Sequence, residues 1–156
     1  MYQNILVALD GSSSSKRALK EAVGLAAVTK GVVHALYVTD KTPLFSYAGY
    51  YDPIAFIEAV RKDGHSALQE AERACAVADV ECRAELVETN NLSDDVASAV
   101  LRHADQVHAE LLVMGTHGRR GVRRLVIGSV AEQVVRFSRC PVLLIREEHK
   151  HESVAE

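Results

Sequence analysis

Short apolar runs rich in β-branched residues alternate with longer amphipathic stretches along this chain, and this alternation restricts the possible folds more than any other feature. Five runs have the composition of strands, at residues 5–9, 32–38, 80–87, 111–114 and 141–145. Most are almost continuously apolar, as in strands buried on both faces, whereas 80–87 alternates as an edge strand does. Because strands separated by amphipathic helices form parallel sheets covered on both faces, the sequence predicts a doubly wound α/β fold.

Residues beside the amphipathic stretches predict where the helices begin and end. Hydroxyl groups at positions 12–15 offer N-caps to the first helix, and Gly31 is expected to end it. An Asp-Pro pair at 52–53 favours the start of the second helix, and Ser93 is expected to cap the third. Segment 39–51, with a proline and four aromatic residues, is predicted to be a loop.

The length and charge of the chain exclude several classes of protein. Its 156 residues suit a single domain, expected at residues 1–147, with a polar tail at 148–156. With 18 basic and 21 acidic residues the net charge is −3, which argues against a nucleic-acid coat or a polybasic membrane clamp. The longest apolar runs fall far short of the ~20 residues that cross a bilayer. The expected partners therefore include neither nucleic acid nor a membrane.

Cysteine usage indicates a reducing compartment. Cys75, Cys82 and Cys140 are odd in number and form no C-x-x-C pair, so neither a disulfide framework nor a zinc cage is predicted. The first residues lack the basic and long apolar regions of a secretory signal. We therefore expect a cytoplasmic protein whose thiols are ordinary core or near-surface groups.

A glycine-bearing segment carries the strongest functional signal. Gly115, Gly118 and Gly128 lie between the end of a buried strand and a helix predicted to run from Ser129 to Phe137. Glycines let backbone N–H groups approach a ligand closely, and a helix N-terminus adds unsatisfied N–H groups and a positive dipole end. This arrangement favours an anion such as a polyphosphate. A tight turn followed by a helix cap, with no ligand, fits the same spacing, and the spacing alone leaves both interpretations open.

These residues also carry a resemblance to a known family. The spacing G-x2-G-x9-G-S at residues 115–129 resembles the nucleotide-binding signature of the universal stress protein family. Residues 5–12 resemble the first strand and turn of that family, and residues 140–145 resemble its closing strand. The three matches occur in the family's order and cover residues 1 to about 147.

The resemblance implies a fold, a ligand and an assembly. It implies a five-stranded parallel sheet of order 3-2-1-4-5 and a homodimer formed through the last strand, Val142 to Ile145. It also implies membership of the branch that binds ATP, accompanied by Mg²⁺ held by the phosphates and not by protein ligands. The residues that it assigns to ATP are Ala8, Asp10, Val38, Met114, Gly115, Gly118, Gly128, Ser129 and Val130. The charge of Arg119 adds this residue to the predicted ATP-binding set.

The resemblance assigns each of these residues a role. Asp10 is expected to meet the ribose, and the backbone around Ala8 and Val38 is expected to meet the adenine. Met114 and Gly115 are expected to form the floor of the nucleotide site. The residues expected to hold the phosphates are Gly118, Gly128, Ser129 and Val130.

Four cations lie in the predicted phosphate loop, at Arg119, Arg120, Arg123 and Arg124, and they could offset phosphate charge, since guanidinium geometry suits phosphate oxygens. A solvated face is the alternative, and it is preferred for at least two of the four.

The function expected from this reading is a nucleotide-responsive stress or signalling module with an unidentified protein partner. Two alternatives remain open: a slow ATPase or self-phosphorylating protein with Ser129 or a loop serine as the acceptor, and an interaction domain whose glycine loop is structural. His117 lies between motif glycines and could hydrogen-bond a phosphate, but the sequence identifies no nucleophile and orienting partner for it. His34 is predicted to be a satisfied core histidine, whereas His103 and His108 are expected on the surface.

Overall fold

The computed structural model describes residues 1–46, 49, 52–91, 93–118 and 127–148, and strands alternate with helices as predicted. The elements are β1 (Asn4–Leu9), α1 (Ser13–Thr29), β2 (Val32–Thr39), α2 (Thr42–Ser46), α3 (Pro53–Val77), β3 (Glu81–Glu88), α4 (Val96–Gln106), β4 (Leu111–Gly115), α5 (Ser129–Phe137) and β5 (Val142–Ile145).

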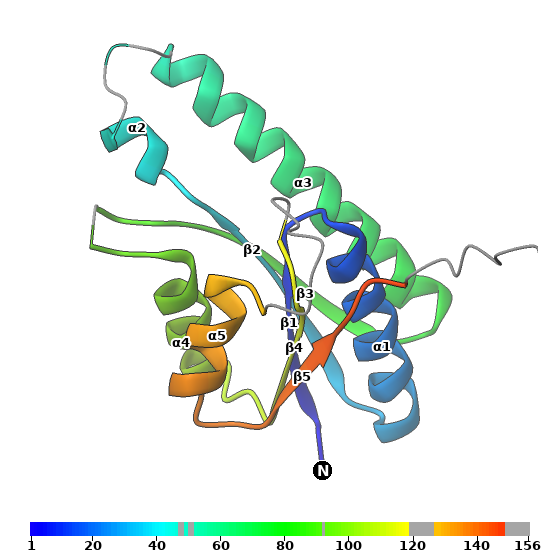
Figure 1. Cartoon of the computed structure of the whole chain (residues 1–156). Helices are drawn as coiled ribbons and strands as arrows, with labels where there is room; N and C mark the ends of the chain where they lie inside the picture. Colours follow the sequence, from blue (N-terminus) through cyan, green and yellow to red (C-terminus); the bar gives the residue numbers. More distant parts are fainter. Residues whose placement is uncertain (47–48, 50–51, 92, 119–126, 149–156) are drawn as a thin grey trace, which may run out of the picture.

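The five strands form one sheet in the order β3-β2-β1-β4-β5, and every neighbouring pair is parallel (Figure 1). β1 is central, and its Ala8 pairs with Leu36 of β2 on one side and with Met114 of β4 on the other. The predicted doubly wound fold and strand order are therefore confirmed. Because the strand order reverses at β1, the carboxyl ends of β1 and β4 form the position where ligands of such sheets bind.

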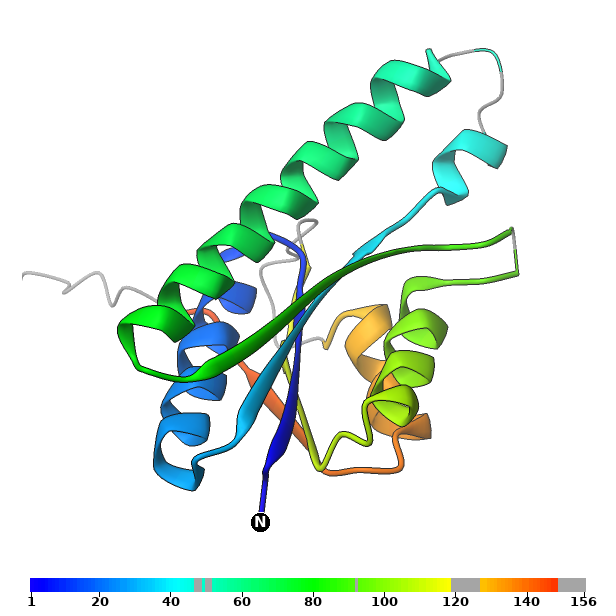
Figure 2. The same ribbon diagram turned by 180° about the vertical axis from the view of Figure 1, so that it is seen from behind.

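Helices cover both faces of the sheet (Figure 2): α1 and α3 pack on one face, and α4 and α5 pack on the other. Successive residues of β1 face opposite layers, so Ile5 and Val7 pack beside α1 and α3, whereas Leu6 packs beside α4 and α5. All three are fully buried, which explains why this strand is continuously apolar. Residues of β3 alternate between exposed and half-buried over most of its length, as predicted for an edge strand.

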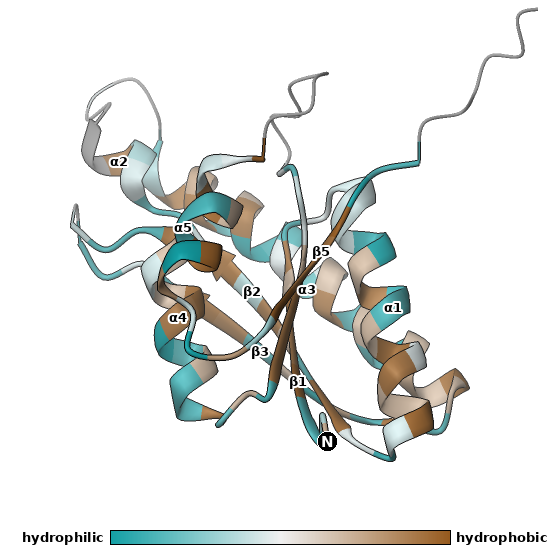
Figure 3. Cartoon of the chain, turned by 60° about the horizontal axis from the view of Figure 1, so that its bottom comes forward, coloured by the Kyte–Doolittle hydropathy of each residue, from teal (hydrophilic) through white to brown (hydrophobic). Residues whose placement is uncertain are grey.

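Hydropathy follows these layers. Figure 3 shows the strands largely in brown, with teal positions on the outer surfaces of the helices. Among the residues that the structure describes, no helix is both long enough and apolar enough to cross a membrane.

The predicted helix caps are confirmed at two helices and wrong at a third. Ser12 caps α1 by accepting the backbone N–H of Ser15. Asp52 caps α3 by accepting two backbone N–H groups of the first turn. α4 is capped by Asp95 and not by Ser93, because the Asp95 carboxylate accepts the N–H of Ser98 at 2.7 Å. Two adjacent capping types were available in this stretch of sequence, and the tertiary structure selects the residue at which the helix begins.

The predicted end of α1 is also corrected. The left-handed capping residue is Lys30, with φ 55°, and not Gly31. Gly31 is required for a different reason: a Cβ atom there would lie 2.7 Å from the carbonyl oxygen of Tyr2. The glycine therefore permits a close backbone approach between the end of α1 and the start of the chain.

Segment 39–51 is not wholly a loop, because α2 forms within it. The Asp40 side chain accepts the N–H of Thr42 at 2.9 Å, and the carbonyl of Lys41 accepts the N–H of Leu44 at 3.0 Å. These local bonds stabilise a helix too short to show a hydrophobic period, so the sequence pattern did not indicate it.

Of two predictions about histidines near the amino ends of the strands, one is confirmed and the other is wrong. His34 is buried, and its Nε2 lies 3.3 Å from Asn4 Oδ1, as predicted for a satisfied core histidine. Its pKa lies below the ordinary value, chiefly because of burial. The prediction of a surface position is wrong for His103, which is 5% exposed and lies 3.6 Å from Glu85 Oε2 through its Nε2. His103 follows Val100 by three positions and shares its buried helix face.

Candidate functional site

The candidate site begins where β1 ends and the chain turns into α1. The Asp10 carboxylate accepts the backbone N–H of Ser12 at 2.8 Å through Oδ1, which stabilises a tight turn at the strand end. Gly11 lies inside this turn with φ 80°, a conformation that glycine adopts without strain. The turn leaves the second carboxylate oxygen, Oδ2, near the segment that follows β4.

Serine side chains connect the start of α1 to that segment. Ser14 is 2% exposed, and its Oγ donates to the carbonyl oxygen of His117 at 2.6 Å. The Oγ of Ser12 donates to the same oxygen at 3.4 Å. The sequence predicted these serines only as helix caps, because nothing in it shows which carbonyl will lie beside them after folding.

Gly115 has a packing role that requires no ligand. A Cβ atom at this position would lie 2.3 Å from Ser14 Oγ and 3.0 Å from the backbone carbonyl carbon of Ser14. Only glycine therefore allows the end of β4 to pack against the first turn of α1 at this separation. For Gly115, therefore, packing against Ser14 explains the glycine whether or not a ligand binds.

The other two motif glycines lie close to different groups. A Cβ atom on Gly118 would lie 3.0 Å from Asp10 Oδ2, so the glycine faces the carboxylate across the sheet end. Gly128 donates its N–H to the carbonyl oxygen of Thr116 at 2.8 Å. This bond joins the two ends of the connection between β4 and α5, which brings the three glycines to one edge of the sheet.

The N-terminus of α5 opens at this edge. Its N-cap is Gly128, which supplies no side-chain hydrogen bond, and its first residue, Ser129, is exposed. The first N–H groups of a helix have no partner within the helix, so an anion can bind them favourably. The positive end of the helix dipole adds to this attraction, although the negative charge of Glu132 in the first turn partly offsets it.

His117 presents a second group with unused hydrogen-bonding capacity. Its Nδ1 lies 2.9 Å from Thr116 Oγ1, and its Nε2 is buried with no hydrogen-bond partner among the described residues. Leaving a buried polar atom unpaired is unfavourable. A ligand that bonds to Nε2 would remove that cost.

Apolar residues line the side of the site next to α4 and α5. Ala8, Val38, Met114 and Val130 belong to, or pack against, the same apolar cluster on that face of the sheet. Ala8 and Met114 are register partners on adjacent strands. The structure thus places the predicted site residues at one end of the sheet, polar groups beside apolar ones, except for Arg119, which lies outside the described residues.

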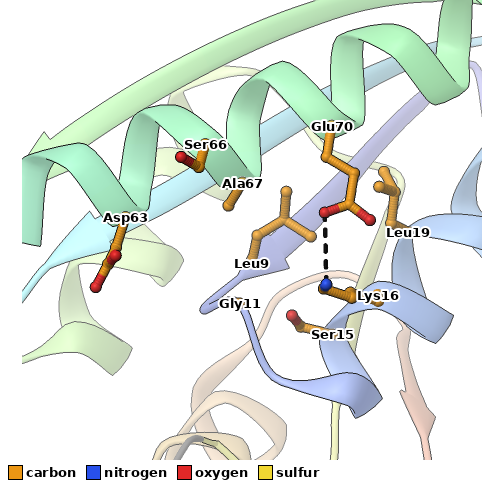
Figure 4. A pocket seen from close by; sticks show the side chains of 9 residues that line it. All are labelled: Leu9, Gly11, Ser15, Lys16, Leu19, Asp63, Ser66, Ala67 and Glu70. Atoms are coloured by element: carbon orange, nitrogen blue, oxygen red, sulfur yellow. Dashed lines mark ion pairs between the residues drawn. The ribbon is translucent and has the colours of Figure 1, made fainter.

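A separate cavity of about 190 Å³ lies between α1 and α3 (Figure 4). Lys16 and Glu70 form an ion pair of 3.7 Å across it, and Gly11 and Ser15 border it. It shares no lining residue with the set assigned to ATP. Within the described ranges, no group of three or more His, Cys, Asp or Glu residues is arranged to hold a metal ion.

Charged side chains gather at the carboxyl end of β3. Glu88 pairs with Lys41 and, at 2.6 Å, with Arg61, and hydrogen bonding by these cations lowers the pKa of Glu88. Asp94 accepts the N–H of Asn90 at 2.8 Å and pairs with Arg102 at 3.2 Å. These contacts lower the pKa of Asp94 below its ordinary value of 3.8. The hydrogen bond from Asn90 makes the largest contribution, and the one from Arg102 the second largest.

We expect Asp94→Asn to lower the free energy of unfolding by about 1 kcal/mol near neutral pH. Because the folded-state pKa of Asp94 lies below its ordinary 3.8, its stabilisation is complete above that value and is lost as pH falls through the folded-state pKa. Urea unfolding at about pH 7 and about pH 3 should therefore show a smaller difference in acid. Glu21→Gln, on the exposed side of α1, serves as the control, and an equal loss at both pH values would contradict the prediction.

Comparison with known proteins agrees with the architecture. The model of the universal stress protein family matches residues 1–146. Universal stress protein YxiE of Bacillus subtilis is 33% identical over 153 residues, a match that covers 94% of this chain and 100% of the relative. A crystal structure from the same family, from Burkholderia pseudomallei, is 38% identical with a TM-score of 0.75 and covers 92% of this chain and 96% of that one.

A crystal structure of a universal stress protein in complex with cAMP has the same fold, with 24% identity, a TM-score of 0.70 and coverage of 94% of this chain and 99% of that one. The match of the family model extends over nearly all of the described residues, and the relatives are themselves covered almost completely. This chain therefore belongs to the universal stress protein family.

Proposed function

We propose that this chain is a nucleotide-binding module that holds ATP, with accompanying Mg²⁺, at the carboxyl ends of β1 and β4. The observation that carries the proposal is the meeting of three groups at one edge of the sheet: the Asp10 carboxylate, the side-chain-free Gly118 beside it, and the N-terminus of α5 without a side-chain cap. A carboxylate suits a sugar hydroxyl, and free helix N–H groups suit phosphate oxygens. Adenine nucleotides contain both.

The phosphates would bind at the start of α5. The N–H groups of Ser129 and Val130 belong to its first turn, where no intrahelical acceptor exists. Gly118 leaves room for a phosphate near the strand ends, and His117 Nε2 is available to bond with a phosphate oxygen. Mg²⁺ would be held through the phosphates, as is usual for an ion that retains several of its waters.

The adenine and ribose would lie toward the strand ends. Ala8, Val38 and Met114 supply an apolar surface for the base, and Asp10 Oδ2 would accept a hydrogen bond from the ribose. The cAMP complex of a relative with this fold supports an adenine nucleotide as the ligand class, because cAMP contains the same base, sugar and a phosphate.

We further propose that the protein acts in the cytoplasm as a homodimer and that nucleotide occupancy alters the surface offered to a protein partner. β5 is an edge strand of half-buried apolar residues, and Phe137 of the adjacent α5 is 63% exposed. An unpaired edge strand favours pairing with another strand, and a two-fold dimer through residues 142–145 would cover this edge.

Titration of ATP with Mg²⁺ into purified, nucleotide-stripped protein tests the function. We expect micromolar affinity by calorimetry and a dimer mass by light scattering of the same sample. Absence of binding to folded protein would leave an interaction domain with a structural glycine loop. Release of ADP or phosphate in proportion to time would instead support the ATPase alternative.

A further inference from the structure

A polar cavity of about 420 Å³ lies between α4 and the amino halves of β2 and β3, away from the carboxyl ends of β1 and β4. Its walls include two histidines from different elements, His34 of β2 and His103 of α4, and each is only 5% exposed. None of the residues assigned to ATP lines this cavity. A proposal about it therefore does not rest on the proposed function.

The charged groups of the cavity follow from the alternation of side chains along β3. Arg83 is the register partner of His34, and both line the cavity beside α4. Glu81 and Glu85 lie two positions before and two positions after Arg83, so they face the same side of the sheet. Further along the strand this face carries Val87, which packs in the apolar cluster. The layer beneath α4 thus changes from charged to apolar along β3.

Both carboxylates of this layer already have partners. Glu81 pairs with Arg83 at 2.7 Å, and Oε2 of Glu85 lies 3.6 Å from Nε2 of His103. His108 borders the cavity just after the end of α4, and it is exposed. The charges around the cavity therefore include no described carboxylate that is reserved for a further cation.

His34 has an uncharged partner instead. Its Nε2 lies 3.3 Å from Asn4 Oδ1, and in the tautomer with hydrogen on Nε2 the ring donates this bond while Nδ1 stays unprotonated. A proton added to Nδ1 would create a buried cation close to Arg83 and His103. Burial, followed by the charges of Arg83 and His103, lowers the pKa of His34 below its ordinary value of 6.5, although the two carboxylates act in the opposite direction.

We propose that His34 is a pH-sensitive switch for the packing of α4: the neutral ring lets the helix pack over β2 and β3, and the protonated ring moves the carboxyl half of α4 away from the sheet. A buried charge is unfavourable unless it is paired, and an outward movement of α4 admits water to the ring and separates it from His103. The amino half of α4 stays attached through Ala97 and Val100, which belong to the apolar cluster.

The direction of the pH dependence follows from the folded-state pKa of His34. Because this pKa lies below the ordinary 6.5, the unfolded chain takes up the proton first as the solution is acidified. The stability that neutral His34 contributes is therefore complete above about pH 6.5 and is lost as the pH falls from there toward the folded-state pKa.

Thermal unfolding of the full chain without nucleotide, at about pH 7.5 and about pH 5.5, is the first test. The melting temperature of the wild type should fall by roughly 4 °C between the two. His34→Gln stays neutral at both pH values, so its melting temperature should fall by less than half as much. His65→Gln, on the exposed surface of α3, is the matched control and should show the wild-type fall.

Hydrogen–deuterium exchange, corrected for the intrinsic effect of pH, locates the change. Amides in the carboxyl half of α4 should lose about 10-fold more protection in acid than amides of α1, which packs on the opposite face of the sheet. A merely structural role of His34 would not produce this difference between the two helices.

Two results would overturn the proposal: an equal fall in melting temperature for the wild type and His34→Gln, or an equal loss of protection in α4 and α1 of the wild type. The second comparison uses the wild type alone, so it decides the question even if His34→Gln does not fold.

Discussion

Gly115→Ala is expected to lower the free energy of unfolding by about 2–3 kcal/mol, with a fall in melting temperature of roughly 5–10 °C. The added methyl group would lie 2.3 Å from Ser14 Oγ and 3.0 Å from the Ser14 backbone carbonyl carbon. A side-chain rotation could relieve the first contact but not the second, so the first turn of α1 must move. That movement also weakens the buried bond from Ser14 Oγ to the His117 carbonyl.

Gly24→Ala is the matched control for this substitution. Gly24 lies inside α1, and a Cβ atom there would meet nothing within 4 Å. The same change of side chain should therefore raise the free energy of unfolding, by about 0.5–1 kcal/mol, through helix propensity alone. Urea unfolding without nucleotide measures both variants, and a Gly115→Ala protein as stable as the wild type would show that the β4–α1 contact is looser than described.

Gly118→Asp is expected to reduce the affinity for ATP with Mg²⁺ by about 100-fold, equivalent to about 2.7 kcal/mol. The new carboxylate would project from a position whose Cβ lies 3.0 Å from Asp10 Oδ2. It would place negative charge in the space proposed for phosphate and would repel the carboxylate proposed to bind ribose. Calorimetric titration at low ionic strength measures the loss where electrostatic effects are least screened.

Gly118→Asn separates charge from size. Asparagine has nearly the same shape as aspartate but is neutral, so we expect its loss of affinity to stay within about tenfold. Equal losses in the two variants would mean that crowding, and not charge, excludes the ligand. Full affinity in Gly118→Asp would contradict the proposed location of the phosphates. Because Gly118 is exposed, both variants should unfold near the wild-type temperature.

The fold was predictable because its signals are local. Strands buried on both faces need apolar side chains at every position, so β1 and β4 are recognisable without knowledge of their neighbours. β3 alternates because one of its faces is more exposed. The strand order is not contained in these patterns, and it was predicted only through the family resemblance.

The candidate site was predictable in part. The motif glycines were recognised by their spacing, but the reasons for them differ in the folded chain: Gly115 packs on Ser14, and Gly118 faces Asp10. The bond from Ser14 to His117 joins residues 103 positions apart, and a serine run has no feature that identifies its distant acceptor. The ATP contacts themselves stay predictions until the titrations described above are made.

The sequence by itself determined the five strands and the four longer helices, but not α2, and hence a parallel sheet with two covered faces, because hydrophobic period and capping residues act within a few positions of one another. Only the tertiary structure decided that His103 is buried and that Gly115 must lack a side chain. Each of these depends on a distance between elements that the chain brings together. Such distances are set by packing across the whole sheet, to which no local pattern of residues corresponds.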